Sequence, residues 1–165
     1  MEFKFLKHSE IGKDKLDDII FLKKIHWDYS VEEHLNWMEV NLKMNDIHVL
    51  AYDEFDLVAY LNLVESKVTI ENKSYSFLGV GNVCTKVKHK GYGSILIKEV
   101  DKYIIHKNKP GILLCKDSLI GFYLKNDWEL LDKNDVEADF NLLNAMIFNM
   151  SVELRNRKIL IEKEF

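Results

Sequence analysis

The stretch Val83-Cys84-Thr85-Lys86-Val87-Lys88-His89-Lys90-Gly91-Tyr92-Gly93-Ser94 decides the predicted fold, because it joins the end of an apolar strand to the start of a helix. The first backbone N–H groups of a helix have no partner within it, and the helix dipole adds positive potential at that end. Gly91 and Gly93 permit a tight turn and the close approach of an anion, and Lys88 and Lys90 add positive charge. The loop is therefore expected to bind a phosphate or pyrophosphate group.

A bare Gly-x-Gly such as Gly91-Tyr92-Gly93 is, on its own, more often an ordinary turn. It is not a dinucleotide-binding fingerprint, because the third glycine at the expected spacing is missing. It is not a P-loop either, since no Gly-Lys followed by Ser or Thr is present in the stretch. The predicted helix and strands on either side of the loop are therefore needed to distinguish a phosphate site from an ordinary turn.

Hydrophobic periodicity predicts the elements on both sides of the loop. After it, a helix over Ser94–His106 and a fully apolar strand over Ile112–Cys115 predict one parallel strand pair. Before it, apolar runs separated by polar turns predict an antiparallel meander. The predicted strands of this meander are Ile47–Tyr52, Leu57–Val64, a shorter one at Val68–Ile70, and Tyr75–Thr85.

The two ends of the chain complete the prediction. A second helix is expected to begin at Ser30, where Ser30 and Glu33 form a capping box. The other expected elements are a strand at Phe3–Lys7, helices from Lys13 to about Lys24 and over Leu119–Lys125, strands at Trp128–Leu131 and Asn144–Met150, and an edge strand or irregular segment from Arg155 onward. The predicted fold is a single α/β domain over residues 1–165, with a central mixed, mostly antiparallel sheet, one parallel strand pair and about four flanking helices.

Composition narrows the function class. The net charge of −4 argues against a nucleic-acid-binding protein, which would carry a concentrated basic face. The longest apolar runs fall far short of the roughly 20 residues that cross a bilayer, and the N-terminus lacks the apolar core of a signal peptide. Cys84 and Cys115 fit a reducing compartment, and the six histidines show no metal-ligand spacing. A cytoplasmic protein without a metal is therefore expected.

Two segments resemble the GNAT superfamily of N-acetyltransferases. Lys88-His89-Lys90-Gly91-Tyr92-Gly93 is similar to its acetyl-CoA motif, usually Q/R-x-x-G-x-G/A, with lysine in the first position. Gly121 to Trp128, reading Gly-Phe-Tyr-Leu-Lys-Asn-Asp-Trp, resembles the segment F-Y-x-K-x-G-F/W, with Asp127 in place of the usual glycine. The two motifs stand in the family's order, with the predicted helix and strand between them. The resemblance covers most of the chain from Leu57 to Met150.

The resemblance implies acetyl-CoA as co-substrate. Its pantetheine arm would bond to the backbone of the strand before the loop, and its pyrophosphate to the amides that follow. The cofactor-binding residues implied are Val83, Cys84, Thr85, Lys88, His89, Lys90, Gly91, Tyr92, Gly93 and Ser94.

The resemblance also implies direct transfer of the acetyl group, with Tyr123 as the general acid that protonates the CoA thiolate. The alternative is that Tyr123 only packs with its aromatic neighbours. Many relatives place a catalytic glutamate on the strand before the loop, but Phe77 to Thr85 contains no carboxylate. Glu65, Glu33 and Asp139 are candidates for the general base, and none of them is preferred over a solvated surface charge. Covalent catalysis by Cys84 or Cys115 is disfavoured, because neither has a predicted histidine partner.

The acceptor site implied by the resemblance combines aromatic and acidic residues, namely Trp27, Tyr29, Glu33 and Asp139. Such a set suits a cationic primary amine, and the C-terminal segments are somewhat similar to aminoglycoside acetyltransferases. Two alternatives stay open: a catalytically silent relative that binds CoA as a sensor or assembly module, and an unrelated α/β phosphate-binding domain. A homodimer through an edge strand is compatible with the sequence.

Overall fold

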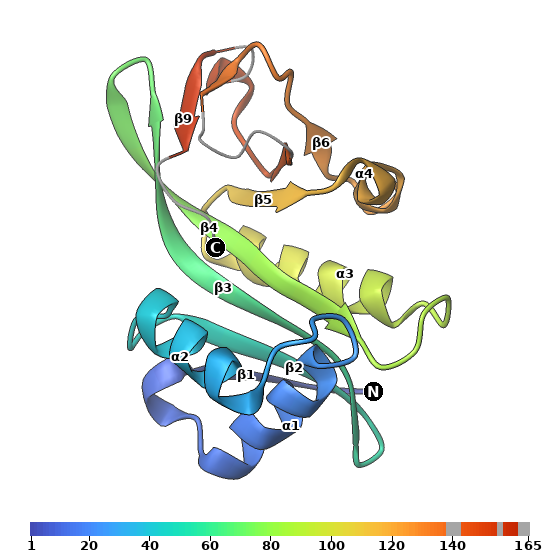
Figure 1. Cartoon of the computed structure of the whole chain (residues 1–165). Helices are drawn as coiled ribbons and strands as arrows, with labels where there is room; N and C mark the ends of the chain where they lie inside the picture. The colour runs from blue at the N-terminus through green and yellow to red at the C-terminus, as the bar shows by residue number, and fades with distance from the viewer. Residues whose placement is uncertain (138–142, 155–156, 162–165) are drawn as a thin grey trace. The chain divides into compact units, whose positions relative to one another are not determined.

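The computed structural model describes the chain except for residues 138–142, 155–156 and 162–165 (Figure 1). The helices are α1 (Lys13–Lys23), α2 (Val31–Asn41), α3 (Tyr92–His106) and α4 (Asp117–Leu124), with short 3₁₀ turns η1 (His8–Glu10) and η2 (Val152–Leu154). The strands are β1 (Glu2–Lys7), β2 (Ile47–Asp53), β3 (Asp56–Ile70), β4 (Lys73–Thr85), β5 (Gly111–Cys115), β6 (Glu129–Leu130), β7 (Val136–Glu137), β8 (Asn144–Phe148) and β9 (Ile159–Ile161).

The strands follow the order β1-β2-β3-β4-β5-β8-β6, and β9 pairs with β3 and β7. Most pairs are antiparallel, and β4 and β5 form the predicted parallel pair through Leu78–Val80 and Gly111–Leu113. This confirms the predicted fold class, a mixed α/β fold with a mostly antiparallel sheet. A second, two-residue parallel pairing joins β7 to β9, which the sequence did not predict.

The chain forms two compact units. The first unit comprises Met1–Val64 and Gly81–Leu96, and the second comprises Glu65–Val80 and Ile97–Phe165. Three elements, β3, β4 and α3, run from one unit into the other. The expectation of a single domain over the whole chain stays a prediction.

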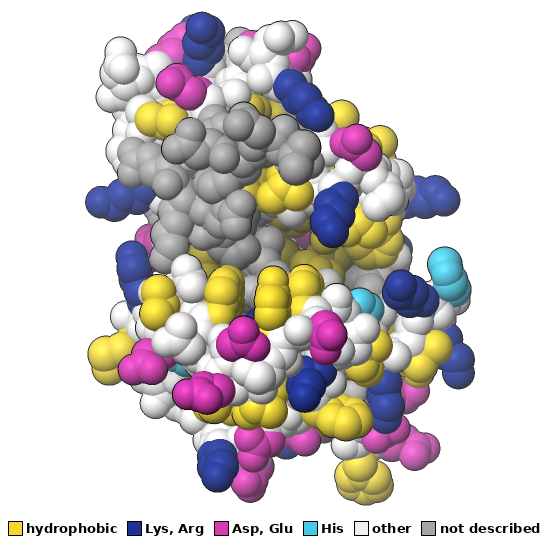
Figure 2. All heavy atoms as spheres, in the orientation of Figure 1, with side chains coloured by type: hydrophobic (Ala, Val, Ile, Leu, Met, Phe, Trp, Pro, Cys, Tyr) yellow, Lys and Arg dark blue, Asp and Glu magenta, His cyan; other side chains and the backbone are white. Residues whose placement is uncertain are grey.

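In the first unit, α1 and α2 lie on one face of β1–β3 (Figure 1). Helix α2 begins where the capping box was predicted: Ser30 Oγ accepts from the Glu33 N–H, and the Glu33 carboxylate accepts from the Ser30 N–H at 2.7 Å. On the face formed by α1 and α2, exposed hydrophobic side chains lie beside acidic ones and lysines (Figure 2). The buried part of the unit includes Ile19, Leu22 and Met38 from these helices.

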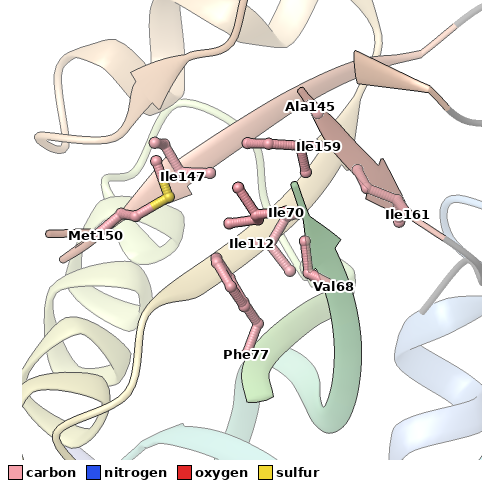
Figure 3. Packing of buried hydrophobic residues seen from close by; sticks show 9 residues of the cluster. All are labelled: Val68, Ile70, Phe77, Ile112, Ala145, Ile147, Met150, Ile159 and Ile161. Atoms are coloured by element: carbon pink, nitrogen blue, oxygen red, sulfur yellow. The ribbon is translucent and has the colours of Figure 1, made fainter. Parts of the chain in front are cut away.

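In the second unit, one cluster of buried side chains joins β3, β4, β5, β8 and β9 (Figure 3). Phe77, Ile112 and Ile147 come from three of these strands, and the cluster is almost entirely aliphatic. The burial of so much apolar surface is the main driving force for this packing. Gly111 at the start of β5 is closely enclosed: an added Cβ would lie 2.9 Å from Ile104 Cδ1 and 3.0 Å from the Trp128 ring, so these side chains would have to shift to admit it.

Two predicted boundaries were wrong. The strands expected at Leu57–Val64 and Val68–Ile70 are one continuous strand, β3, because Glu65 and Lys67 are exposed on one side while their neighbours are buried on the other. The strand expected at Trp128–Leu131 shortens to β6. The C-terminal segment does form a strand, β9, but not the expected edge strand, because β9 pairs with Val68–Ile70 of β3 and also with β7. No helix of the described residues is long and apolar enough to cross a membrane.

Candidate functional site

The loop between β4 and α3 has the backbone shape that the sequence suggested. His89 and Gly91 adopt left-handed φ angles of 64° and 80°. At Gly91 an added Cβ would meet nothing within 4 Å, so the glycine is favoured by its φ angle rather than by crowding. Lys88, His89 and Lys90 are exposed, and within the described part of the chain neither lysine forms an ion pair. The loop therefore presents positive charge beside the N-terminus of a 15-residue helix.

Two aspartates of the β2–β3 turn hold this loop at both ends. Lys86 Nζ lies 2.9 Å from Asp56 Oδ2, and the Tyr92 hydroxyl donates to Asp53 Oδ2 at 3.1 Å. The hydrogen bond to Asp53 is the main reason that the pKa of Tyr92 is raised. These anchors were not predicted from the sequence, because the turn and the loop are more than 25 residues apart in it. They restrict the loop without using Lys88 or Lys90.

The end of β4 is also fixed on both sides. The Lys86 N–H donates to Val58 C=O on β3 at 2.8 Å, and His26 Nε2 lies 2.7 Å from Thr85 C=O. The Thr85 carbonyl, one of the groups expected to meet the pantetheine arm, therefore already accepts a hydrogen bond from the α1–α2 connection. Asn82 has a left-handed φ of 53° within β4, and its amide donates to Asn62 Oδ1 at 2.7 Å.

A buried lysine lies next to this strand end. Lys23 is only 2% exposed, and its Nζ lies 4.6 Å from the centre of the Trp37 ring and 5.9 Å from that of Trp27. Burial lowers the pKa of Lys23 to about 8. Burial in turn raises the pKa of Cys84 to about 12. Cys84 is therefore a protonated thiol at neutral pH and a poor nucleophile.

A chain of hydrogen bonds between titratable groups runs through the same unit. The Tyr60 hydroxyl lies 2.8 Å from His48 Nδ1, and His48 Nε2 lies 2.9 Å from His8 Nδ1. Burial, followed by the charges of His8 and Lys23, lowers the pKa of His48 to about 4. Burial raises the pKa of Tyr60 well above its ordinary value. No sequence signal linked these residues, since each stands on a different element.

The residues predicted to bind the acceptor amine differ in the contacts that they make in the structure. Tyr29 is exposed and meets the His34 ring edge-on, and Trp27 contacts His26 and Lys23. The Glu33 carboxylate caps α2, and the backbone hydrogen bond from Ser30 lowers its pKa. Asp139 lies outside the described residues. Glu65, a candidate base, is bonded to Ser76 and Lys109 in the second unit.

Tyr123 belongs to the second unit, at the end of α4. Its side chain is buried between Phe122 and Trp128, with ring centroids 4.9 and 6.3 Å away. Burial, and next the charge of Cys115, raises its pKa above the ordinary value of about 10. Trp128 in turn donates through Nε1 to Asp101 Oδ1 at 3.0 Å.

Asp127, which stands where the resembled motif has glycine, has a left-handed φ of 64°. It follows the C-terminus of α4, where the Trp128 N–H donates to Tyr123 C=O at 3.2 Å. A left-handed residue after a helix is most often glycine, and Asp and Asn are the side chains that tolerate it best. The departure from the motif therefore keeps the backbone geometry that the glycine usually provides.

The structure places the expected residues in two groups. The first unit holds the strand end and loop, Val83 to Ser94, together with Trp27, Tyr29 and Glu33, and the second holds Tyr123. Among the described residues, no cluster of His, Cys, Asp or Glu has the arrangement of a metal site. Both cysteines are buried and free.

No protein-family model and no curated protein matches the sequence. Solved structures nevertheless share the fold over nearly the whole chain. ElaA of Escherichia coli matches with a TM-score of 0.62 at 19% identity, over 88% of this chain and 97% of that one. An acyl-CoA N-acyltransferase from Pseudomonas aeruginosa matches with a TM-score of 0.66 at 14% identity, over 89% and 99%. An aminoglycoside 6'-N-acetyltransferase in complex with coenzyme A matches with a TM-score of 0.63 at 13% identity, over 90% and 96%. The chain thus has the fold of the GNAT N-acetyltransferases.

Proposed function

We propose that the chain is an N-acetyltransferase that moves an acetyl group from acetyl-CoA to a primary amine of a small cationic acceptor. The observation that carries the proposal is the loop from Lys88 to Ser94, with two left-handed residues and two exposed lysines, at the start of α3. On this fold, such a loop offers backbone N–H groups and positive charge to the CoA pyrophosphate. The lysine at position 88 supplies charge where the motif has Gln or Arg.

Direct transfer is favoured over a covalent intermediate on a cysteine. Burial raises the pKa of Cys84 to about 12 and also raises that of Cys115. A thiol with such a pKa carries almost no thiolate at neutral pH, and the thiolate is the nucleophilic form. The amine of the acceptor is therefore proposed to attack the thioester itself, and the CoA thiolate leaves.

Tyr123 is proposed as the group that donates to the leaving thiolate. Unperturbed pKa values of about 10 for tyrosine and 8.5 for a thiol make proton transfer uphill by about 2 kcal/mol. Burial raises the pKa of Tyr123 further, so its hydroxyl stays protonated and is a permanent hydrogen-bond donor. Complete transfer of the proton then requires positive charge near Tyr123 in the complex, which would lower its pKa again.

An aminoglycoside is the first acceptor to test. The support is the structural similarity to an aminoglycoside 6'-N-acetyltransferase, together with the aromatic and acidic side chains of the first unit. Exposed Tyr29 and the acidic residues of α1 and α2 are available to a cationic ligand, whereas Trp27 already faces the Lys23 ammonium. Of the residues expected to bind the acceptor, Tyr29 is therefore the stronger candidate.

A thermal-shift titration with acetyl-CoA, CoA and ATP tests the cofactor. A ligand present at about 100 times its Kd adds about 2.7 kcal/mol to the stability of the native state, which raises the melting temperature measurably. Stabilisation by the CoA ligands and not by ATP is expected. If millimolar CoA has no effect, the acetyltransferase proposal is wrong, and a preference for ATP would favour an unrelated phosphate-binding domain.

The second candidate function is a catalytically silent module that binds CoA as a sensor. The raised pKa of Tyr123 is the observation that favours it, because it makes a weaker acid of the expected catalytic group. A thiol-release assay with acetyl-CoA and a panel of amines separates the two: the proposed enzyme releases CoA only with an acceptor, and a silent module never does. The two buried free cysteines fit the cytoplasm as the proposed location.

A further inference from the structure

The last residues of β4 run along an open edge of the sheet. β4 pairs with β5 from Leu78 to Val80, and within the described residues no strand pairs with β4 on that side beyond Val80. A strand without a neighbour leaves backbone N–H and C=O groups that can pair with another extended chain. The pantetheine arm of CoA carries amide groups, so it can bind such an edge as a short extra strand would.

An irregularity at Asn82 decides which backbone groups face the open edge. The Leu78 N–H donates to the residue that precedes β5, whereas the Lys86 N–H donates to β3. Because the two residues are an even number of positions apart, a regular strand would point both N–H groups to the same side. One extra residue reverses the direction, and Asn82 has the left-handed φ of 53° that such a bulge can use. After the bulge, Val83 and Thr85 therefore turn their N–H and C=O groups toward the open edge.

His26 already occupies the groups that Thr85 turns outward. Its Nε2 lies 2.7 Å from the Thr85 carbonyl oxygen and 3.4 Å from the Thr85 nitrogen. The shorter contact is that of a good hydrogen bond with the imidazole N–H as donor, and the ring then also covers the Thr85 N–H. The backbone of Val83 has no such side-chain partner among the described residues. Val83 and Thr85 are both half-buried, so this end of β4 reaches the surface.

The connection between α1 and α2 holds the His26 ring in this position. The N–H groups of His26 and Trp27 both donate to Lys23 C=O, at 2.9 and 3.0 Å, and form a tight turn at the end of α1. The His26 ring also lies near that of Trp27, with ring centroids 5.8 Å apart. A side chain that is already restrained by its backbone and by a neighbouring ring loses little entropy when it binds Thr85. The contact of His26 with Thr85 is therefore preorganised.

We propose that His26 is a positioning residue for acetyl-CoA: by closing the edge of β4 at Thr85, it leaves Val83 as the residue with which the pantetheine arm pairs. This inference rests on the proposed acetyltransferase function. The two positions are two residues apart, so pairing at Thr85 would shift the arm by about 6–7 Å along the strand. Because the pyrophosphate is proposed to bind the loop before α3, such a shift would move the thioester away from the place of transfer.

A purely structural role for His26 is the alternative. A half-buried carbonyl needs a hydrogen-bond partner, and His26 supplies one to Thr85. Positioning is favoured because Thr85 directly precedes the basic loop, and because the same connection carries Trp27 and Tyr29, which are expected at the acceptor. A structural role predicts that changes at His26 lower stability and leave the register of the bound arm as it is.

The first test locates the arm by NMR on ¹⁵N-labelled protein, with CoA and with 3′-phospho-ADP, which is the part of CoA without the arm. In the wild type, CoA is expected to protect the Val83 N–H from exchange with solvent and to change the Thr85 N–H little. The nucleotide alone is expected to affect the loop before α3 and neither of these two amides. In His26→Ala, CoA is expected to act on Thr85 as well. Loss of the His26 contact and protection of Thr85 by CoA in the wild type would overturn the inference.

The second test is kinetic, with acetyl-CoA and kanamycin. In His26→Ala an unproductive register competes with the productive one, so kcat and the KM for acetyl-CoA are both expected to fall by the same factor. This factor is about twofold if the two registers are equally populated, and larger if the unproductive one dominates. The ratio kcat/KM for acetyl-CoA is expected to stay near the wild-type value. A fall in kcat at an unchanged KM for acetyl-CoA would contradict a second register and overturn the inference.

Two further variants separate positioning from a loss of stability. His26→Gln keeps an amide N–H that can donate to Thr85 C=O, and it is expected to restore the wild-type NMR pattern and kinetics. His106→Ala changes an exposed histidine at the end of α3 and is expected to have no effect. If His26→Ala is less stable but CoA still protects only Val83, the role of His26 is structural and the inference is wrong. If the wild type binds neither CoA nor the nucleotide, the proposed function itself fails, and the inference with it.

Discussion

The indole N–H of Trp128 donates a 3.0 Å hydrogen bond to the Asp101 carboxylate, and both side chains are buried in the second unit. Burial and, to a smaller extent, the charge of Asp127 raise the pKa of Asp101 to about 7, although the hydrogen bond from Trp128 lowers it. In the unfolded chain the pKa of an aspartate is about 3.9. Folding therefore favours the protonated acid, and the stability gained from it is lost as the pH rises from about 4 through about 7.

Replacing Asp101 by Asn keeps an acceptor for the Trp128 N–H but removes the buried charge. Asp101→Asn is expected to be more stable than wild type near pH 8, by on the order of 2 kcal/mol, and about equally stable near pH 4. Urea unfolding at the two pH values measures the difference. Asp17→Asn, at an exposed position of α1, is the control and is expected to change nothing. A pH-independent effect of Asp101→Asn would contradict the raised pKa.

The left-handed backbone at Asp127 leads to a second prediction. Because φ is 64° there, Asp127→Gly is expected to stabilise the protein by about 0.5–1 kcal/mol, and Asp127→Ala to destabilise it by a similar amount. Removing the charge of Asp127 is also expected to lower the pKa of Asp101. Thermal unfolding of both variants near pH 5, where Asp101 is largely protonated, isolates the backbone effect. Equal stability of the Gly and Ala variants would contradict the left-handed conformation.

The loop before α3 gives a third prediction. Lys88→Ala and Lys90→Ala are each expected to weaken binding of CoA several-fold at low salt and less at high salt, because exposed charges are screened. Gly91→Ala is expected to weaken binding at both salt concentrations, since it opposes the φ of 80° without any steric contact. Titration calorimetry at about 50 and 300 mM NaCl measures these effects. Lys13→Ala, an exposed lysine at the start of α1, is the control.

How far the sequence predicted the structure depends on the distance between the interacting residues. The capping box of Ser30 and Glu33 was predicted because both partners lie within one turn. The break expected near Glu65 was wrong because charged residues on the exposed side of a strand resemble a turn in the sequence. The chain of Tyr60, His48 and His8 could not be predicted, since it depends on the register of β2 with β3 and on a histidine from another element.

In the candidate site too, features set by neighbouring residues were predicted, and contacts between residues distant in the sequence were not. The tight turn before α3 was predicted from local residues, and Gly91 has the left-handed φ angle that such a turn uses, while the binding of a phosphate there stays a prediction. Its anchors, Asp53 and Asp56, were missed, because they stand in a polar turn that looks like any other in the sequence. The lysine that faces Trp27 was missed because Lys23 sits at the end of an amphipathic helix, where a lysine is usually exposed.

Tyr123→Phe tests the proposed acid. Turnover is expected to fall about tenfold or more, while the affinity for CoA stays nearly unchanged, because the hydroxyl acts only on the leaving thiolate. Steady-state kinetics together with thermal shift measure the two quantities. Tyr103→Phe, on the half-buried side of α3, is a matched tyrosine outside the proposed site. Wild-type turnover in Tyr123→Phe would remove Tyr123 from the mechanism and leave it as a packing residue.

The buried ammonium of Lys23 gives the last prediction. The folded state lowers its pKa to about 8, mainly by burial, whereas in the unfolded chain the pKa is about 10.4. The stability that the neutral amine provides is therefore present above about pH 10 and lost as the pH falls through about 8.

Lys23→Met removes the buried charge and keeps an unbranched side chain against Trp37, but it also removes the cation–π contact. The variant is expected to be more stable than wild type near pH 7 by on the order of 1–2 kcal/mol, with a smaller difference near pH 10. Urea unfolding measures both, and Lys24→Met, at the exposed neighbouring position, is expected to leave stability unchanged. If Lys23→Met instead destabilises the protein at both pH values, the contact of the ammonium with the indole rings outweighs the cost of burying it.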